Sequence, residues 1–216
     1  FGAHSCCCKR CFILMIQIKN NSFPTARTPA PSDKYPRLNN RMRVNIGEVA
    51  TSSEPCDMDT VLGSCVAVCL HDPVHRIGGM NHILLPGKNL NRVNTRYGIY
   101  AMELLINELM KRGADRKRMI AKAFGGACVI PGMQQMLIGD HNAQFVREFL
   151  LTERIPLVAQ RLGGKQAVLV RFRTDTGKAI VHSVDGSYLP RVVSEEKSYE
   201  KAHLADVLYT GEITLF

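Results

Sequence analysis

Residues 60–86, TVLGSCVAVCLHDPVHRIGGMNHILLP, carry the signal that decides the fold of this chain. The short apolar and β-branched run at 66–70 predicts one strand, and the run at 77–85 predicts a second. Between them, Asp72-Pro73 is a typical turn signal. The stretch therefore predicts a β-hairpin entered through a glycine-containing turn, Gly63-Ser64.

The hairpin brings a thiol and an imidazole together. A tight turn centred on Pro73-Val74 places Cys65 directly opposite His82, and directly opposed residues share one face of a sheet. A slip of one residue would separate them onto opposite faces, so this register is an assumption. A Cys–His pair is a nucleophile because the imidazole takes the thiol proton and the thiolate attacks. The alternative for each residue is a plain core side chain.

Other groups near the hairpin fit the same chemistry. Gly63 and Ser64 form a turn that exposes the next side chain, and backbone N–H groups at such a turn stabilise a developing oxyanion. A third side chain is needed to orient the imidazole. Thr60 and Asp59, just upstream of Cys65, are both candidates. The residues alone predict a Cys–His acyl-transfer hydrolase and give no substrate.

Strand and helix signals alternate along the rest of the chain and predict an α+β fold. The other glycine-rich stretch, Gly125-Gly126-Ala127, follows a buried strand and permits the close approach of a backbone or ligand. Further strands are predicted at 44–49, 59–62, 119–124, 156–159, 167–173, 179–184 and 212–216, and helices at 95–112, 142–151 and 194–204.

Charge divides the chain into two parts. Of the net charge of +9, residues 1–43 carry +7, which leaves a nearly neutral remainder. We therefore expect residues 1–41 to be a poorly ordered, basic and cysteine-rich extension and residues 42–216 to be one folded domain. A near-neutral domain argues against a nucleic-acid partner. Apolar runs are too short for a membrane span, so no membrane insertion is expected.

The eight cysteines do not follow the spacing of a secreted disulfide scaffold. This usage fits a reducing cytoplasm, which also preserves a reactive thiol. The Cys8–Cys11 pair lacks the second pair that a structural zinc site needs, so we expect no bound metal. No phosphate-binding glycine motif is present, and we expect no cofactor.

The segment LGSCVAVCLHDP…GGMNHILLP closely resembles the CheD family of chemoreceptor glutamine deamidases. The resemblance continues through GADRKRMIAKAFGGA at 113–127, IGDHNAQFVREFLLTERIPL at 138–157 and LGG at 162–164. It implies a cytoplasmic hydrolase that converts glutamines of methyl-accepting chemotaxis receptors to glutamate. Cys65 would attack the amide carbon to form a thioester, and His82 would protonate the leaving ammonia and activate water.

The resemblance also implies a fold and a second partner. The expected fold has mixed β-sheets in layers flanked by helices, similar to toxin deamidases of the cytotoxic necrotizing factor kind, and a CheC-type phosphatase is an expected partner of some members. The family threonine commonly stands one position further from the cysteine than Thr60, where this chain has Asp59. Two other functions stay open, which are a Cys–His amidase or peptidase with another substrate and a regulatory binding module without catalysis.

Overall fold

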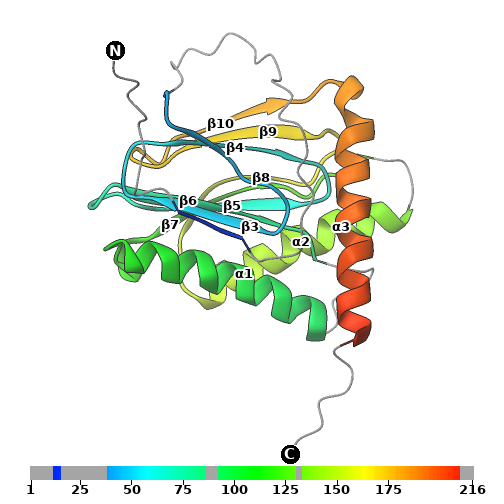
Figure 1. The fold of residues 1–216 in the computed structure, drawn as a ribbon, viewed down its shortest axis with the longest axis horizontal. Coiled ribbons are helices and arrows are strands. Elements are labelled where there is room, and N and C mark those ends of the chain that lie inside the picture. The colour runs from blue at the N-terminus through cyan, green and yellow to red at the C-terminus, as the bar shows by residue number, and fades with distance from the viewer. Residues whose placement is uncertain (1–11, 16–37, 86–91, 130–132, 210–216) are drawn as a thin grey trace, which may run out of the picture.

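The computed structural model describes residues 12–15, 38–85, 92–129 and 133–209. Two mixed β-sheets and a layer of helices are stacked on one another (Figure 1), which confirms the predicted α+β class. In the described ranges, no helix is both long and apolar enough to cross a membrane.

The central layer is a six-stranded sheet in the order β1-β3-β6-β5-β7-β8. Its strands are β1 (Phe12–Met15), β3 (Glu48–Ser52), β5 (Val66–Asp72), β6 (Ile77–Ile83), β7 (Ile120–Gly125) and β8 (Leu157–Leu162). All neighbours are antiparallel except β7 and β8. The predicted hairpin thus forms the middle of the sheet as β5 and β6.

A four-stranded sheet covers one face of the central sheet, in the order β10-β9-β4-β2. It contains β2 (Arg41–Arg43), β4 (Asp57–Leu62), β9 (Val168–Arg173) and β10 (Ala179–Ser183). Strands β9 and β10 form the predicted hairpin, with Gly177 at φ +64° in its turn. Because β4 leads directly into the turn before β5, the chain passes from one sheet to the other at Gly63-Ser64.

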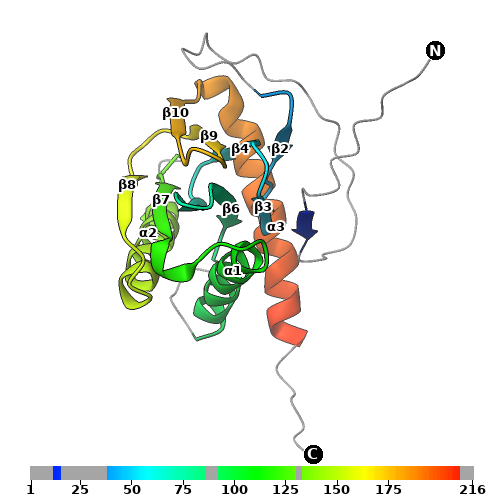
Figure 2. The ribbon, with the colours of Figure 1, turned by 90° about the vertical axis from the view of Figure 1, so that its left-hand side faces the viewer.

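Two helices cover the other face of the central sheet, and a third runs across the ends of the strands. Helices α1 (Arg92–Lys111) and α2 (Met133–Thr152) pack against the sheet, whereas α3 (Leu189–Tyr209) runs past the ends of both sheets (Figures 1 and 2). Two short 3₁₀ turns complete the described elements, η1 (Arg116–Arg118) and η2 (Gly186–Tyr188).

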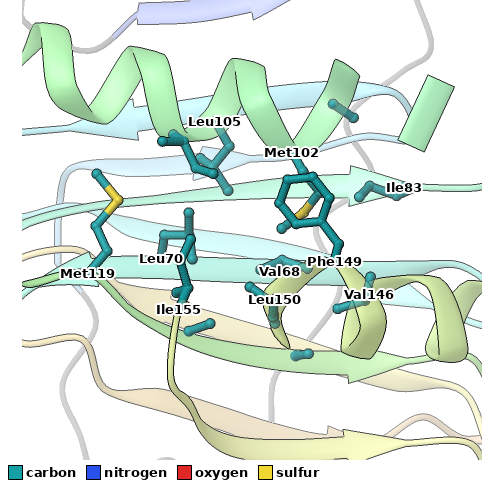
Figure 3. Close-up of a cluster of buried hydrophobic side chains, with 14 of the residues drawn as sticks. Val68, Leu70, Ile83, Met102, Leu105, Met119, Val146, Phe149, Leu150 and Ile155 are labelled. Carbon is teal, nitrogen blue, oxygen red and sulfur yellow. The ribbon is translucent and has the colours of Figure 1, made fainter. Parts of the chain in front are cut away.

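Side chains alternate between two cores along β5. Val66, Val68 and Leu70 pack with the helices, and Figure 3 shows this cluster between α1, α2 and the sheet. Cys65 and Cys69 face the other way, into the core between the two sheets. A strand buried on both faces has a continuous apolar run in its sequence, as residues 66–70 of β5 do.

Several boundaries differ from the sequence-based expectation. The strand predicted at 44–49 is wrong, because β2 ends at Arg43 and β3 begins at Glu48. A turn separates them in which the Glu48 N–H donates to the Asn45 carbonyl at 3.0 Å and Gly47 has φ +82°. Helix α2 begins earlier than predicted, and α3 begins at Leu189 because Pro190 is tolerated in a first helical turn.

The expected division of the chain at residue 41 stays a prediction. Within the extension, the structure describes β1, which pairs with β3, and the residues from Leu38 onward. Most of the extension, including Cys8 and Cys11, lies outside the described residues. The strand expected at 212–216 also lies outside them.

Candidate functional site

Cys65 lies at the point where the chain crosses from β4 to β5, and it is 1% exposed. The glycine-rich stretch after β7 holds this crossing in place. Gly126 N–H donates to the Cys65 carbonyl and Ala127 N–H donates to the Gly63 carbonyl, both at 2.7 Å. A Cβ at Gly125 would lie 2.2 Å from the Cys65 carbonyl oxygen. The close backbone approach predicted for this stretch is therefore confirmed.

His82 lies on β6 and shares a face with Cys65, but not in the predicted register. His82 pairs with Ala67, so direct opposition of Cys65 and His82 is wrong by two residues. The cause is a longer turn, because Asp72 pairs with Ile77 and four residues connect them. A shift of two residues preserves the face, so the two side chains are diagonal neighbours directed into the space between the sheets.

The imidazole of His82 is fixed by a hydrogen-bond network on its Nδ1 side. Nδ1 lies 2.9 Å from Oγ1 of Thr60 and 3.3 Å from the Val44 carbonyl oxygen. The Thr60 hydroxyl itself donates to the same carbonyl at 2.7 Å. Since the hydroxyl proton is used there, Oγ1 accepts from Nδ1–H. The network therefore assigns the proton to Nδ1 and leaves Nε2 with a free lone pair.

The Nε2 atom of His82 is buried and has no hydrogen-bond partner among the described residues. Burial lowers the pKa of this imidazole to about 4, so it is neutral near pH 7. A neutral imidazole with an available lone pair is in the form required of a general base.

Asp59, the other candidate for orienting the imidazole, lies elsewhere. Successive residues of a strand point to opposite faces, so Asp59 faces away from Thr60 and from the inter-sheet core. Its Oδ1 accepts from Arg171 at 3.3 Å, and its Oδ2 accepts from Arg41 at 2.6 Å. The structure thus brings Thr60, and not Asp59, to His82.

The turn residues Gly63 and Ser64 lie against Glu196, a residue that the sequence did not indicate. The Ser64 hydroxyl donates to Oε2 of Glu196 at 2.6 Å, and the Cys65 N–H donates to Oε1 at 3.2 Å. A Cβ at Gly63 would lie 2.9 Å from the same Oε1. Two donors on this turn therefore converge on one carboxylate, which is the arrangement that an oxyanion would require.

The same carboxylate affects the thiol. Burial raises the pKa of Cys65 well above its ordinary value, and the charge of Glu196 and its hydrogen bond with the thiol raise that pKa further. The thiol is therefore protonated in this conformation. Two more cysteines of the fold, Cys56 and Cys69, are fully buried in the inter-sheet core, where they pack as small apolar side chains.

Asn142 is a second residue that sequence reasoning missed. Its amide nitrogen donates to the Ser64 carbonyl at 3.1 Å, and its amide oxygen accepts from the Leu85 N–H at 2.8 Å. This buried side chain on α2 ties the Cys65 turn to the end of β6. The sequence placed it at the start of a helix, and no local pattern connects it to a turn 78 residues away.

No cluster of three or more potential metal-ligating side chains occurs in the part of the chain that the structure describes. Near Cys65 the structure places Ser64 and Glu196 at the turn, and His82 and Thr60 on the neighbouring strands. The chemistry of this group is that of a thiol, a base and convergent donors, which suits attack on a carbonyl or carboxamide carbon.

Comparison with known proteins places this chain in a family. A family model described as CheD chemotactic sensory transduction matches residues 84–183. A protein of Stenotrophomonas maltophilia (strain K279a), named as a probable chemoreceptor glutamine deamidase CheD, is 46% identical over 160 residues. That alignment covers 74% of this chain and 80% of the relative.

Two further relatives have the same name. The one from Xanthomonas euvesicatoria pv. vesicatoria (strain 85-10) is 47% identical over 160 residues, covering 74% of this chain and 80% of its own length. The one from Burkholderia mallei (strain SAVP1) is 51% identical over 139 residues, covering 62% of this chain and 59% of its own length. Identity at this level over most of the chain confirms the resemblance found in the sequence, and the chain belongs to the CheD family.

Proposed function

We propose that this chain is a chemoreceptor glutamine deamidase, as its relatives are named, and that Cys65 is its nucleophile. One observation carries the assignment of residues. The Thr60 network holds the Nδ1 proton of His82 and leaves Nε2 free, which supports Nε2 as the base for Cys65 on the same face of the sheet. We therefore assign a Cys–His–Thr arrangement to Cys65, the neutral imidazole of His82 and the orienting hydroxyl of Thr60.

The reaction has two halves. In the first, Nε2 of His82 takes the Cys65 proton and the thiolate attacks the carboxamide carbon of the substrate glutamine. The Cys65 N–H and the Ser64 hydroxyl stabilise the oxyanion. The carbon–nitrogen bond then breaks, and the imidazolium gives its proton to the departing ammonia. A thioester remains on Cys65.

In the second half, His82 removes a proton from water, and the resulting hydroxide attacks the thioester carbon. The carbon–sulfur bond breaks, the thiol is restored, and the side chain leaves as glutamate. The sum is one glutamine and one water converted to one glutamate and one ammonia. No metal or organic cofactor takes part in this proposal, and Gly63 serves to let the turn bend.

Location, fold relationship and partners follow from the proposal. The receptor segments that such an enzyme would modify are cytoplasmic, so we place the chain in the cytoplasm, with membrane-anchored receptors as its substrates. The layering of two mixed sheets with helices supports a relationship to the toxin deamidases. A CheC-type phosphatase is a further proposed partner.

A regulatory binding module is the second candidate function. The observation that favours it is the carboxylate of Glu196 against the Cys65 turn, which keeps the thiol protonated. In that case the chain would bind receptors or a phosphatase without turnover.

Ammonia release from a purified receptor cytoplasmic fragment separates the two functions. We expect release with the intact chain and none with Cys65→Ala. Cys69→Ala is the matched control, because Cys69 is a buried thiol four residues further along, on β5, in the same inter-sheet core, and it should retain activity. Equal release from all three proteins would exclude Cys65 as the nucleophile, and no release from a folded intact chain would favour the binding module.

A further inference from the structure

Helix α3 occupies the site in front of Cys65. It runs across the ends of both sheets, at the side where β4 ends and β5 begins (Figures 1 and 2). Its residue Glu196 accepts the hydrogen bonds of Ser64 Oγ at 2.6 Å and Cys65 N at 3.2 Å. These are the donors assigned above to the oxyanion of the reaction. In this structure they bind Glu196, which lies 131 residues from Cys65 in the sequence.

One face of α3 fits this surface closely. Val192, Glu196 and Tyr199 follow one another at intervals of four and three residues, which places them on one side of a helix. A Cβ at Gly63 would lie 3.0 Å from Val192 Cγ1, and a Cβ at Gly47 would lie 2.7 Å from Tyr199 Oη. Glycines at these two positions therefore make room for side chains of α3.

Little space remains between α3 and the Cys65 turn. A cavity of about 30 Å³ lies there, lined by Ser64 and Leu84 on one side and by Val193 and Glu200 of the helix on the other. That volume accommodates a water molecule and is far too small for a second helix. Because Cys65 is 1% exposed and α3 lies against its turn, movement of α3 away from the turn would open the thiol to a protein substrate.

The neighbouring, more exposed side of α3 makes contacts of a different kind. Glu195, adjacent to Glu196, pairs with Arg191 at 2.9 Å, and both side chains are about half exposed, at 46% and 45%. The helix therefore presents Glu196 to the site and Glu195, the residue before it, to solvent.

We infer that α3 is an inhibitory helix that holds a glutamate, the product of the reaction, where the substrate side chain binds, and that a substrate helix must displace it. This inference rests on the proposed deamidase function, since only then is glutamate the product. A carboxylate cannot acylate a thiol at this site without an activated leaving group, so Glu196 occupies the site without being consumed.

The negative charge of Glu196 also makes the Cys65 thiol harder to deprotonate. It raises the pKa of the Cys65 thiol beyond the effect of burial, whereas a neutral glutamine in its place would not. Displacement of α3 by a substrate glutamine would therefore uncover the donors of the turn and ease deprotonation of the thiol in one step.

Substitution of Glu196 by glutamine turns this geometry into a chemical test. In Glu196→Gln, the amide at position 196 lies where the substrate amide would be. Cys65 should form a thioester with the side-chain carbon while ammonia leaves, and water should then hydrolyse the thioester to glutamate. Mass spectrometry of the purified variant should find position 196 converted back to glutamate, and the same variant with Cys65→Ala should keep its amide.

Glu195→Gln is the matched control, because position 195 is on the solvent side of the same helix and should keep its amide. Conversion at 196 and not at 195, dependent on Cys65, would support the inference. An intact amide at 196 in a variant that still deamidates receptors would overturn it, because position 196 would then not coincide with the substrate position.

A second experiment separates failure of the inference from failure of the proposed function. Alkylation of Cys65 by iodoacetamide requires access to the thiol but no receptor chemistry. We expect Glu196→Ala to raise both the alkylation rate and kcat/KM on a receptor fragment by about tenfold, as expected when a closed state is removed. Glu195→Ala should behave as the unsubstituted chain does.

Faster alkylation of Glu196→Ala, with no receptor deamidation by any variant, would show that α3 covers the thiol but would contradict the proposed function. Receptor deamidation by the intact chain with no gain in either rate in Glu196→Ala would overturn the inhibitory helix and leave the proposed function standing.

Discussion

Nδ1 of His82 lies 2.9 Å from Oγ1 of Thr60, although the two residues belong to different sheets. The packing of β4 against β6 therefore decides which nitrogen of the imidazole bears the proton. The Thr60 hydroxyl is itself fixed by the Val44 carbonyl at 2.7 Å. The tautomer of His82 is thus a consequence of how the two sheets stack.

Thr60→Val should lower kcat with little change in KM, because Thr60 orients the imidazole and does not face the substrate. We expect a loss of about tenfold to hundredfold, since general acid–base catalysis typically contributes 10²–10⁴ in total. Steady-state kinetics on a receptor fragment provide the measurement. Thr60→Ser keeps the hydroxyl and should recover most of the rate; equal losses in both variants would contradict the orienting role.

Asp59→Asn should destabilise the protein without changing the rate per folded molecule. It breaks the ion pair of Asp59 with Arg171, whose side chain is 4% exposed, and removing one partner of a buried pair costs about 3 kcal/mol. Urea unfolding and kinetics on the same sample make the comparison. A large fall in kcat at unchanged stability would restore Asp59 as a member of the site.

Gly125→Ala should disturb the Cys65 turn and lower activity strongly. Gly125 has φ +105°, and a Cβ there would lie 2.2 Å from the Cys65 carbonyl oxygen. Gly164→Ala is the control, because Gly164 has φ +94° but nothing within 4 Å of an added Cβ. Both variants carry backbone strain of about 1–2 kcal/mol, so an equal loss of activity in the two would contradict a specific effect on Cys65.

The burial of His82 should make stability depend on pH. Its pKa falls from 6.5 to about 4 on folding, so between these values the unfolded chain binds more protons than the folded one. Above pH 6.5, His82 is neutral in both states and does not lower the free energy of unfolding. As the pH falls from 6.5 toward 4, protonation of the unfolded chain lowers that free energy by about 3 kcal/mol, at 1.36 kcal/mol per pKa unit.

Unfolding free energies of the intact chain and His82→Gln, measured across this range, isolate the effect. The difference between the two proteins should shrink as the pH falls. A difference that stays constant would show that His82 is not buried in its neutral form.

The sequence predicted the hairpin, the shared face of Cys65 and His82, and the close approach at Gly125, because each rests on a local signal. It missed the register by two residues, because Arg76 takes φ +57° in the four-residue turn where glycine would have been the visible signal. The choice between Thr60 and Asp59 depended on which face of β4 meets the other sheet, which only the packed structure decides.

The contacts of Asn142 and Glu196 could not be predicted at all. Each joins the Cys65 turn to a helix far along the chain, and no periodicity or motif marks a single polar residue for such a contact. The helix that bears Glu196 was predicted, but not its position across the site.

Conversion of a receptor fragment in water enriched in the heavy oxygen isotope tests the central claim most directly. Peptide mass spectrometry would locate each converted glutamine and report the origin of the new oxygen. The thioester mechanism predicts specific glutamines changed to glutamates that each carry one heavy oxygen, with the intact chain and with Cys69→Ala but not with Cys65→Ala. Unconverted glutamines with the folded intact chain, or conversion that persists in Cys65→Ala, would contradict it.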